Sequence, residues 1–261
     1  MSLAPKKRFG QHFLTSPAIV QRIVDAAEIR NGEAVLEIGP GKGVLTGPLL
    51  DKAGHLFAVE VDSELARALR ESYAGDPRIT VVERDFLDAE LDSLIPGRFK
   101  VVANLPYYIT VPIIESLLVY KRRIDAIVVM VQREMAARMS ARPGNRDYGS
   151  LSVFIQYHAA VETLFDVPPG AFFPPPKVTS SVIRLTPHPP PVAVPDETAF
   201  FAFVKKLFGT RRKMLRTTLR NMFSLTSADL EQIDEIDLSR RPETLSTQEL
   251  ALLYGRISQR P

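Results

Sequence analysis

Short apolar runs recur along the first two thirds of the chain, and stretches with helical spacing of apolar residues separate them. One such stretch places Leu65, Ala68 and Leu69 on one side of a predicted helix. Strands that alternate with helices form a parallel sheet covered on both faces, with right-handed crossovers. The pattern therefore predicts an α/β sheet with strands at about residues 34–39, 56–61, 79–83, 99–103, 124–131, 160–167 and 180–186.

The sequence also marks the ends of a helix that precedes the first of these strands. Ser16-Pro17 is a typical helix start, because proline fits the first helical turn. Asn31-Gly32 is expected to close this helix. Between them, apolar residues recur on one face, at Ile19, Val20, Ile23, Val24 and Ala27.

Proline marks the boundary between two predicted domains. Residues 187–195 are proline-rich and are typical of a semi-rigid linker. We expect a first domain over residues 1–187, the linker over 188–195 and an all-helical domain over 196–261. Within the first domain, residues 140–150 are rich in Arg, Gly and Pro, and we expect a mobile loop between two helices there.

The first predicted strand ends in three glycines at alternate positions, Gly39, Gly41 and Gly43. Such a turn lets main-chain atoms approach a nucleotide-like ligand that side chains would keep away. By itself, the turn predicts a nucleotide site without specifying its purpose.

Polar residues follow the next strands as well. Glu60, about 20 residues beyond the glycines, suits the two hydroxyls of a ribose. Asp85 offers an acceptor for an adenine amino group, next to the apolar ring of Phe86. Taken separately, Glu60 is more typical of a helix-start charge and Asp85 of an N-cap. Because ligands bind outside the carboxyl ends of parallel strands, the ordered series favours a nucleotide-like cofactor.

Composition narrows the possible chemistry. The 261 residues include no cysteine, which excludes disulfides, thiolate metal sites and cysteine nucleophiles. The four histidines are scattered without ligand spacing, so we expect no metal. No apolar stretch reaches transmembrane length, and the N-terminal residues lack the apolar core of a signal peptide. We therefore expect a cytoplasmic protein without a membrane partner; no feature indicates oligomers, so a monomer is the default.

The net charge of +3 is modest but unevenly distributed. Lys6-Lys7-Arg8 is typical of a solvated tail, although a phosphate-contacting arm is the sharper alternative. Residues 205–220 contain no acidic residue, and Phe203, Leu207, Leu215 and Leu219 supply their apolar face. This one-sided segment favours a phosphate-binding surface over a solvated face, with RNA-binding candidates Lys205, Lys206, Arg211, Arg212, Lys213, Arg216 and Arg220.

The fourth predicted strand ends in Asn104-Leu105-Pro106-Tyr107. This stretch resembles the signature of methyltransferases that modify exocyclic amino groups of nucleic-acid bases. The N6 of adenine is a poor nucleophile, so acceptors such as the Asn104 amide oxygen and the Leu105 carbonyl would hold its hydrogens and stabilise the developing positive charge. Pro106 would fix the turn, and Tyr107 offers a face for base stacking, which contributes roughly 1–3 kcal/mol per base.

Several motifs together resemble the rRNA adenine N6,N6-dimethyltransferase family over nearly the whole chain. Besides the glycine turn and Asn104-Leu105-Pro106-Tyr107, the similar segments are Gly10-Gln11-His12-Phe13-Leu14, Phe172-x-Pro174-x-Pro176-Lys177-Val178-x-Ser180 and Arg211-Arg212-Lys213. The end, Arg241-Pro242-Glu243-Thr244-Leu245-Ser246, is similar to the bacterial small-subunit branch. The resemblance implies a Rossmann-like class I methyltransferase domain, with a mostly parallel seven-stranded sheet, and a small all-helical C-terminal domain.

The resemblance also implies an activity and its site. The protein would transfer methyl groups from S-adenosylmethionine, leaving S-adenosylhomocysteine, to two adjacent adenines near the 3′ end of 16S rRNA in the immature small subunit. The implied catalytic residues are Asn104, Leu105, Pro106, Tyr107 and Phe172, with Phe172 closing over the target base opposite Tyr107. The implied cofactor-binding residues are Gln11, His12, Leu14, Gly39, Gly41, Glu60, Asp85 and Asn104.

Other functions compete with this interpretation. The nearest is a large-subunit adenine methyltransferase of the kind that confers macrolide resistance; the Lys177-Val178-x-Ser180 and Arg241-Pro242-Glu243 segments favour the small-subunit branch by resemblance. A mitochondrial member is disfavoured because a transit peptide is missing. A ribosome-assembly factor remains open as a second role. A nicotinamide dehydrogenase lacks any candidate acid/base.

Overall fold

The structure is a computed structural model that describes residues 11–210 and 213–258. The chain divides into two compact units. The first comprises the chain up to Ala136 together with Ala160–Pro187, and the second comprises Ala137–Ala159 together with the chain from His188 onward. No described helix is long and apolar enough to cross a membrane.

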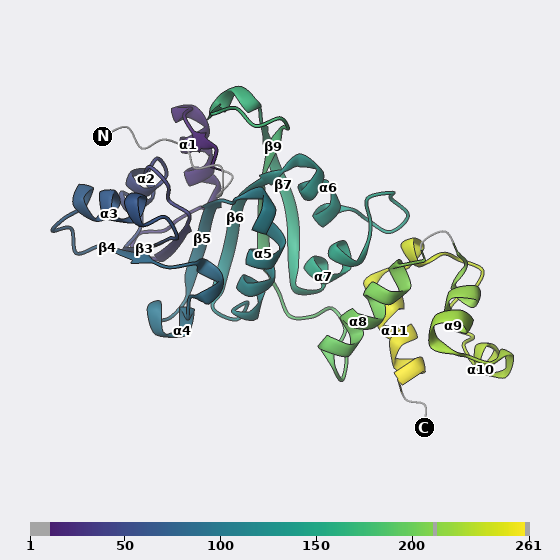
Figure 1. Ribbon diagram of the computed structural model, residues 1–261. Coiled ribbons are helices and arrows are strands. Elements are labelled where there is room, and N and C mark those ends of the chain that lie inside the picture. The colour runs from purple at the N-terminus through teal and green to yellow at the C-terminus, as the bar shows by residue number, and fades with distance from the viewer. Residues whose placement is uncertain (1–10, 211–212, 259–261) are drawn as a thin grey trace. The chain divides into compact units, whose positions relative to one another are not determined.

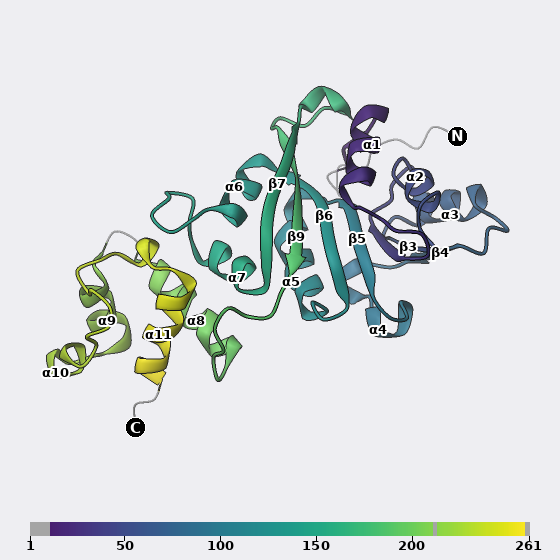
Figure 2. The same cartoon turned by 180° about the vertical axis from the view of Figure 1, so that it is seen from behind.

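A seven-stranded sheet forms the centre of the first unit (Figures 1 and 2). Its strand order is β4-β3-β2-β5-β6-β9-β7. The first five strands in this order are parallel to their neighbours, and β9 runs antiparallel to β6. The predicted α/β fold with a mostly parallel sheet is confirmed, and the strands are β2 Ala34–Ile38, β3 His55–Glu60, β4 Ile79–Glu83, β5 Phe99–Asn104, β6 Ile124–Gln132, β7 Ala159–Val167 and β9 Ser180–Pro187.

The two faces of this sheet are buried by different helices. On one face, Val102 of β5 and Val128 of β6 belong to a core cluster with Val24 of α1 and Leu49 of α2. Successive residues of a strand point to opposite faces, so the equally buried Val101 and its neighbours face the other side. The helix α5 crosses that other side, in front of the sheet in Figure 1 and behind it in Figure 2.

The helices of the first unit follow the predicted alternation: α1 Pro17–Ala26, α2 Thr46–Leu50, α3 Ser63–Ser72, α4 Leu91–Leu94, α5 Thr110–Val119, and the short 3₁₀ turns η2 Phe86–Asp88, η3 Tyr107–Ile109 and η4 Pro169–Ala171. The predicted start of α1 at Pro17 is confirmed. Its predicted end at Asn31-Gly32 is wrong, because the helix ends at Ala26 and Glu28 takes a left-handed φ of 47°. A non-glycine residue in that region breaks a helix as effectively as the expected glycine.

A separate two-stranded ribbon joins residues far apart in the sequence. In it, β1 (Phe13–Leu14) pairs antiparallel with β8 (Phe172–Phe173). Phe13 lies opposite Phe173, and Leu14 lies opposite Phe172. The ribbon thus ties the N-terminal part of the described chain to the loop between β7 and β9.

The second unit is helical and has its own hydrophobic core. Its helices are the end of α6 (Arg133–Ser140), α7 Ser150–His158, α8 Glu197–Phe208, α9 Leu215–Phe223, α10 Ser227–Glu231 and α11 Thr247–Ser258, with the 3₁₀ turn η5 Pro242–Thr244. The domain boundaries predicted from the sequence assign residues 137–159 to the first domain. They belong by contact to the second unit, because Tyr148, Val153 and Tyr157 lie in the same core cluster as Phe200.

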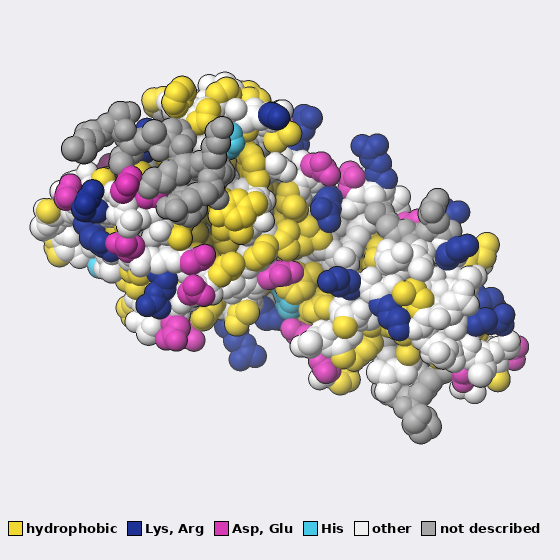
Figure 3. Space-filling model, in the orientation of Figure 1, with side chains coloured by type: hydrophobic (Ala, Val, Ile, Leu, Met, Phe, Trp, Pro, Cys, Tyr) yellow, Lys and Arg dark blue, Asp and Glu magenta, His cyan; other side chains and the backbone are white. Residues whose placement is uncertain are grey.

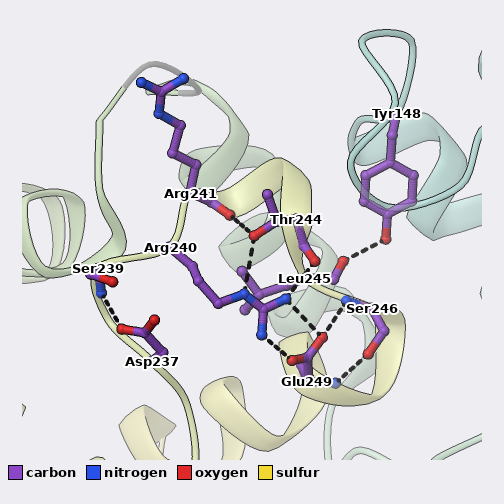
Figure 4. Close-up of polar contacts among 9 residues, drawn as sticks. All are labelled: Tyr148, Asp237, Ser239, Arg240, Arg241, Thr244, Leu245, Ser246 and Glu249. Atoms are coloured by element: carbon purple, nitrogen blue, oxygen red, sulfur yellow. Dashed lines mark hydrogen bonds and ion pairs between the residues drawn. The ribbon is translucent and has the colours of Figure 1, made fainter.

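The segment 237–249 organises the packing of this second unit (Figure 4). The Arg240 guanidinium pairs with Glu249, and the Glu249 carboxylate also accepts the Ser246 N–H at 2.7 Å. The buried Tyr148 hydroxyl donates to the Leu245 carbonyl at 3.0 Å. Arg241, by contrast, points its guanidinium away from these groups. Most of the motif at 241–246 therefore has a structural task.

Candidate active site

One cavity in the first unit collects the polar residues that follow successive strands. It is lined by all eight residues predicted to bind the cofactor, which are Gln11, His12, Leu14, Gly39, Gly41, Glu60, Asp85 and Asn104. Leu105, Pro106 and Tyr107 also line it. Residues from five distant segments therefore meet at the carboxyl ends of β2, β3, β4 and β5, where the sheet topology predicts a ligand.

The glycine turn keeps backbone close to this cavity. Gly39 and Gly41 have φ values of 66° and 58°, which L side chains rarely adopt. A Cβ at Gly41 would lie 3.3 Å from the Phe13 ring, whereas a Cβ at Gly39 would meet nothing within 4 Å. Gly39 therefore borders open space in the cavity, and any side chain there would occupy it.

Glu60, at the end of β3, is held in place by the backbone around it. Its two carboxylate oxygens accept the Gly41 N–H and the Asp62 N–H, each at 2.9 Å. The side chain is 4% exposed, and this burial raises its pKa above the ordinary value, although the two N–H groups act in the opposite direction. Among the described residues it has no cationic partner, so a hydrogen-bond donor in the cavity would find an acceptor ready.

A second buried carboxyl, Glu37 on β2, was not singled out by the sequence. The Thr46 hydroxyl donates to it at 2.7 Å, and burial raises its pKa to about 8. The neighbouring Glu60 charge acts in the same direction. The available signal was an acidic residue inside an apolar strand directly before the glycine turn.

Asn104 connects the end of β5 to the N-terminal segment. Its side-chain nitrogen donates to the His12 carbonyl at 3.3 Å, which assigns the amide oxygen as the atom left to accept hydrogens. The His12 ring nitrogen Nδ1 lies 2.7 Å from the Pro174 carbonyl oxygen. Asn104 is therefore positioned by main-chain contact with the residue directly before strand β1.

Tyr107, which begins η3, stands beside Asn104 in the cavity lining. Its hydroxyl lies 2.7 Å from the Ser180 hydroxyl, and burial raises its pKa above the ordinary value. Its ring stacks with the His12 ring at a centroid distance of 6.0 Å. The phenol is thus neutral at physiological pH, and its ring is fixed at both ends.

The position of Asp85 is compatible with both of the roles considered for it. Its carboxylate accepts the Leu87 N–H at 3.0 Å and so caps η2. The same exposed residue lines the cavity. A carboxylate with several acceptor sites can cap a turn and still accept from a ligand.

Comparison with known proteins identifies the family. The model of the family described as ribosomal RNA adenine dimethylase matches residues 3–259. The chain belongs to this family.

Its relatives include two bacterial proteins named ribosomal RNA small subunit methyltransferase A. The one from Alkaliphilus metalliredigens is 41% identical over 97% of this chain and 92% of its own length. The one from Bacillus mycoides is 43% identical over 97% and 91%.

Solved structures share the fold of this adenine dimethylase family member. The 23S rRNA methyltransferase ErmE is 30% identical with a TM-score of 0.71, over 95% of this chain and 100% of that chain. A dimethyladenosine transferase from Plasmodium falciparum has a TM-score of 0.79 at 24% identity, over 95% and 98%. These neighbours are methyltransferases, in agreement with the predicted fold class.

One residue predicted for the dimethylase site is not in the lining of this cavity. Phe172 is 4% exposed and packs in the core cluster with its ribbon partner Leu14, which does line the cavity. The stacking of Phe172 on the target base stays a prediction. The motif gave the segment correctly, but only the ribbon pairing shows which of its two phenylalanines faces inward.

The basic segment expected to bind RNA lies in the second unit. Lys205 and Lys206 lie in the last turn of α8, Lys213 precedes α9, and Arg216 and Arg220 lie on α9. All five are exposed, and no ion pair joins them to another described residue. Their apolar partners Phe203, Leu207, Leu215 and Leu219 are buried, as the sequence predicted. Arg211 and Arg212, like Lys6-Lys7-Arg8, lie outside the described residues.

Proposed function

We propose that the chain is an S-adenosylmethionine-dependent enzyme that dimethylates N6 of adenines in small-subunit rRNA. Membership of the adenine dimethylase family supports the reaction, and the 41–43% identity to proteins named small subunit methyltransferase A supports the substrate. The observation that carries the proposal is the meeting of the glycine turn, Glu60 and Asn104 in one cavity.

The cavity suits the proposed cofactor. Gly39 leaves the open space that a bulky ligand needs beside the backbone. Glu60 would accept from the ribose hydroxyls, Asp85 from the adenine amino group, and Gln11, His12 and Leu14 would border the methionine part. When bound, the cofactor supplies an electrophilic methyl group on a sulfonium.

Asn104 and Leu105 would then orient the acceptor nitrogen. The Asn104 amide oxygen and the Leu105 carbonyl would accept the two N6 hydrogens, so that the nitrogen lone pair faces the methyl group. The same acceptors would stabilise the positive charge that N6 gains, which is electrostatic stabilisation of the transition state. Pro106 fixes the turn, and the neutral Tyr107 ring would stack on the adenine.

The deciding experiment uses radiolabelled S-adenosylmethionine. The protein is offered under-methylated small subunits, large subunits and naked rRNA of each kind, and label is mapped by primer extension. We expect label on paired adenines near the 3′ end of small-subunit rRNA. Label confined to large-subunit rRNA would show that the substrate is 23S rRNA, as the name of ErmE states for that enzyme. Tight binding to the subunit without label would favour an assembly factor.

We further propose that the basic segment of the second unit contacts rRNA phosphates. Each exposed cation that neutralises a phosphate releases counterions, so removing one reduces the slope of log affinity against log salt by about 1. Arg216→Glu should therefore flatten the salt dependence of rRNA binding, measured by filter binding. An unchanged slope would indicate that this segment is only a solvent-exposed basic face and does not contact rRNA.

A further inference from the structure

Two aromatic side chains of the first unit are exposed without a structural reason. Phe173 is 62% exposed and Tyr108 is 60% exposed. Both directly follow a residue already discussed, Phe172 and Tyr107. Large exposed rings that gather beside a cavity are a candidate contact surface for another molecule.

The ribbon pairing shows which way Phe173 faces. Directly opposed residues of an antiparallel pair lie on the same face, so Phe13 and Phe173 share one face and Leu14 and Phe172 share the other. The second face is buried in the core. Phe13 and Leu14 both line the cavity, so strand β1 borders it with both faces. Phe173 therefore lies on the exposed face of a ribbon that borders the cavity.

Hydrogen bonds connect the segment that carries Phe173 to Asn104. Pro174, next to Phe173, contacts His12 through its carbonyl, and the His12 carbonyl accepts from Asn104. On the other side, Tyr108 itself lines the cavity. Figure 3 shows hydrophobic side chains gathered over the connection between β7 and β9, which appears at the top of Figure 1.

Cationic side chains accompany these rings. Lys177 lies in the same connection and is exposed. Arg133 is exposed at the start of α6, and its backbone N–H donates to the Thr179 carbonyl at 3.0 Å. Neither side chain forms an ion pair with another described residue. Exposed rings interleaved with unpaired cations are the pattern that binds single-stranded nucleic acid, by stacking on bases and attracting phosphates.

We propose that Phe173 and Tyr108 stack on the nucleotides adjacent to the target adenosine, at the rim of the cavity. This inference rests on the proposed function and extends it to the unpaired nucleotides beside the reacting base. When the target adenosine is flipped out of the RNA, the bases on either side of it lose their stacking partner. The rings of Phe173 and Tyr108 take the place of that stacking partner. Both residues are positioning residues for RNA and do not touch the reacting atoms.

The test measures methylation of under-methylated small subunits and binding of S-adenosylhomocysteine. Phe173→Ala and Tyr108→Ala should each raise KM for the subunit about 5- to 100-fold, which is the usual value of one stacked base. Phe173→Trp and Tyr108→Phe should restore it, because they keep an aromatic face. Phe173→Leu should not, although it stays apolar. The affinity of Phe173→Ala for S-adenosylhomocysteine, measured by calorimetry, should stay within two-fold.

A matched control removes exposed apolar surface elsewhere on the same unit. Val119, the last residue of α5, is 78% exposed, and Val119→Ala should leave KM unchanged. Equal KM values for wild type, Phe173→Ala and Tyr108→Ala would overturn the proposal. A wild-type KM for Phe173→Leu would also overturn the proposal, because it would show that an apolar side chain is sufficient and that no aromatic ring is needed.

A further variant separates the two phenylalanines. Phe172→Leu keeps the buried volume, so a rise in KM only for this variant would return base stacking to Phe172 and overturn the role of Phe173. If wild-type protein labels no rRNA, the proposed function fails. If wild type labels rRNA and the Phe173 variants match it, only the present inference fails.

Discussion

Two carboxylates in this protein receive backbone N–H groups in similar ways but differ in everything around them. Glu60, in the cavity of the first unit, accepts from Gly41 and Asp62 and has no cationic partner among the described residues. Glu249, in the second unit, accepts from Ser246 and also pairs with Arg240. Burial raises the pKa of Glu60, whereas the Arg240 guanidinium lowers that of Glu249.

The difference separates a group kept for a ligand from a group used by the fold. A buried carboxylate without a counter-charge costs stability, so a fold keeps it where a ligand repays that cost. A carboxylate that caps a helix and pairs with arginine has both oxygens engaged within the fold, and it contributes stability directly. Perturbed pKa values in opposite directions thus distinguish the two regions.

The largest effect should come from Asn104, because it acts on the transition state. Asn104→Ala should lower kcat for methyl transfer about 10²- to 10³-fold, the usual consequence of removing one such electrostatic contact. Affinity for S-adenosylhomocysteine should stay within a few-fold. Single-turnover methylation and calorimetry measure the two quantities. Retained turnover would remove Asn104 from the proposed chemistry.

Removing the cavity carboxylate should cost binding and spare the fold. Glu60→Ala should weaken S-adenosylhomocysteine binding about 10- to 100-fold, because charged hydrogen bonds contribute about 1.5–3 kcal/mol. The unfolding free energy in urea should not fall by a similar amount, since an uncompensated buried charge is removed. Unchanged affinity by calorimetry would show that Glu60 does not contact the cofactor.

The reverse pattern is expected in the second unit. Glu249→Ala removes the capping interaction at the start of α11 and leaves Arg240 without its partner. We expect a loss of about 1–3 kcal/mol in unfolding free energy, with unchanged affinity for S-adenosylhomocysteine. Urea denaturation followed by circular dichroism measures the first. A stable variant with weakened cofactor binding would contradict the distinction between the regions.

The last prediction concerns pH, where the effect per pH unit is small. Folding raises the pKa of Glu37 from 4.5 to about 8, so the native state holds a proton that the unfolded chain releases. Stability should therefore fall as pH rises between these values, by at most about 1.4 kcal/mol per pH unit, and level off above the folded pKa.

Glu37→Gln keeps an acceptor for Thr46 and should remove this slope in urea titrations at pH 5 to 8. Glu249→Gln serves as the control: because the pKa of Glu249 is lowered, its contribution is lost only as pH falls below about 4.5. A slope that persists in Glu37→Gln would assign the titration to another group.

The sheet was predictable because most of its strands are short apolar runs that alternate with helical spacing along the sequence. Even the last strands, β7 and β9, lie within about a residue of their predicted bounds. The end of α1 was not predictable in this way, because Glu28 adopts a conformation that the sequence assigns to glycine. Residues 137–159 were also misplaced, because Tyr148 and Tyr157 carry no local sign of their partners in residues 200–254.

The cavity was predictable as far as strand ends could be ordered along the sequence. Glu60, Asp85 and Asn104 follow parallel strands, so their meeting required only the topology. The orientation of Phe172 required the pairing of β1 with β8, which bridges more than 150 residues and leaves no periodic signal. The burial of Glu37 could not be predicted without knowing that both faces of β2 are covered.

The second unit draws on two stretches of chain that are separated by strands β7 and β9 of the first. During synthesis, Tyr148, Val153 and Tyr157 leave the ribosome before Phe200 and Leu250, which share their core cluster, have been made. At 5–20 residues per second, the last of these partners follows roughly 5–20 s later. For that interval the three side chains form a nascent apolar surface, so this part of the chain is where a chaperone would bind during translation.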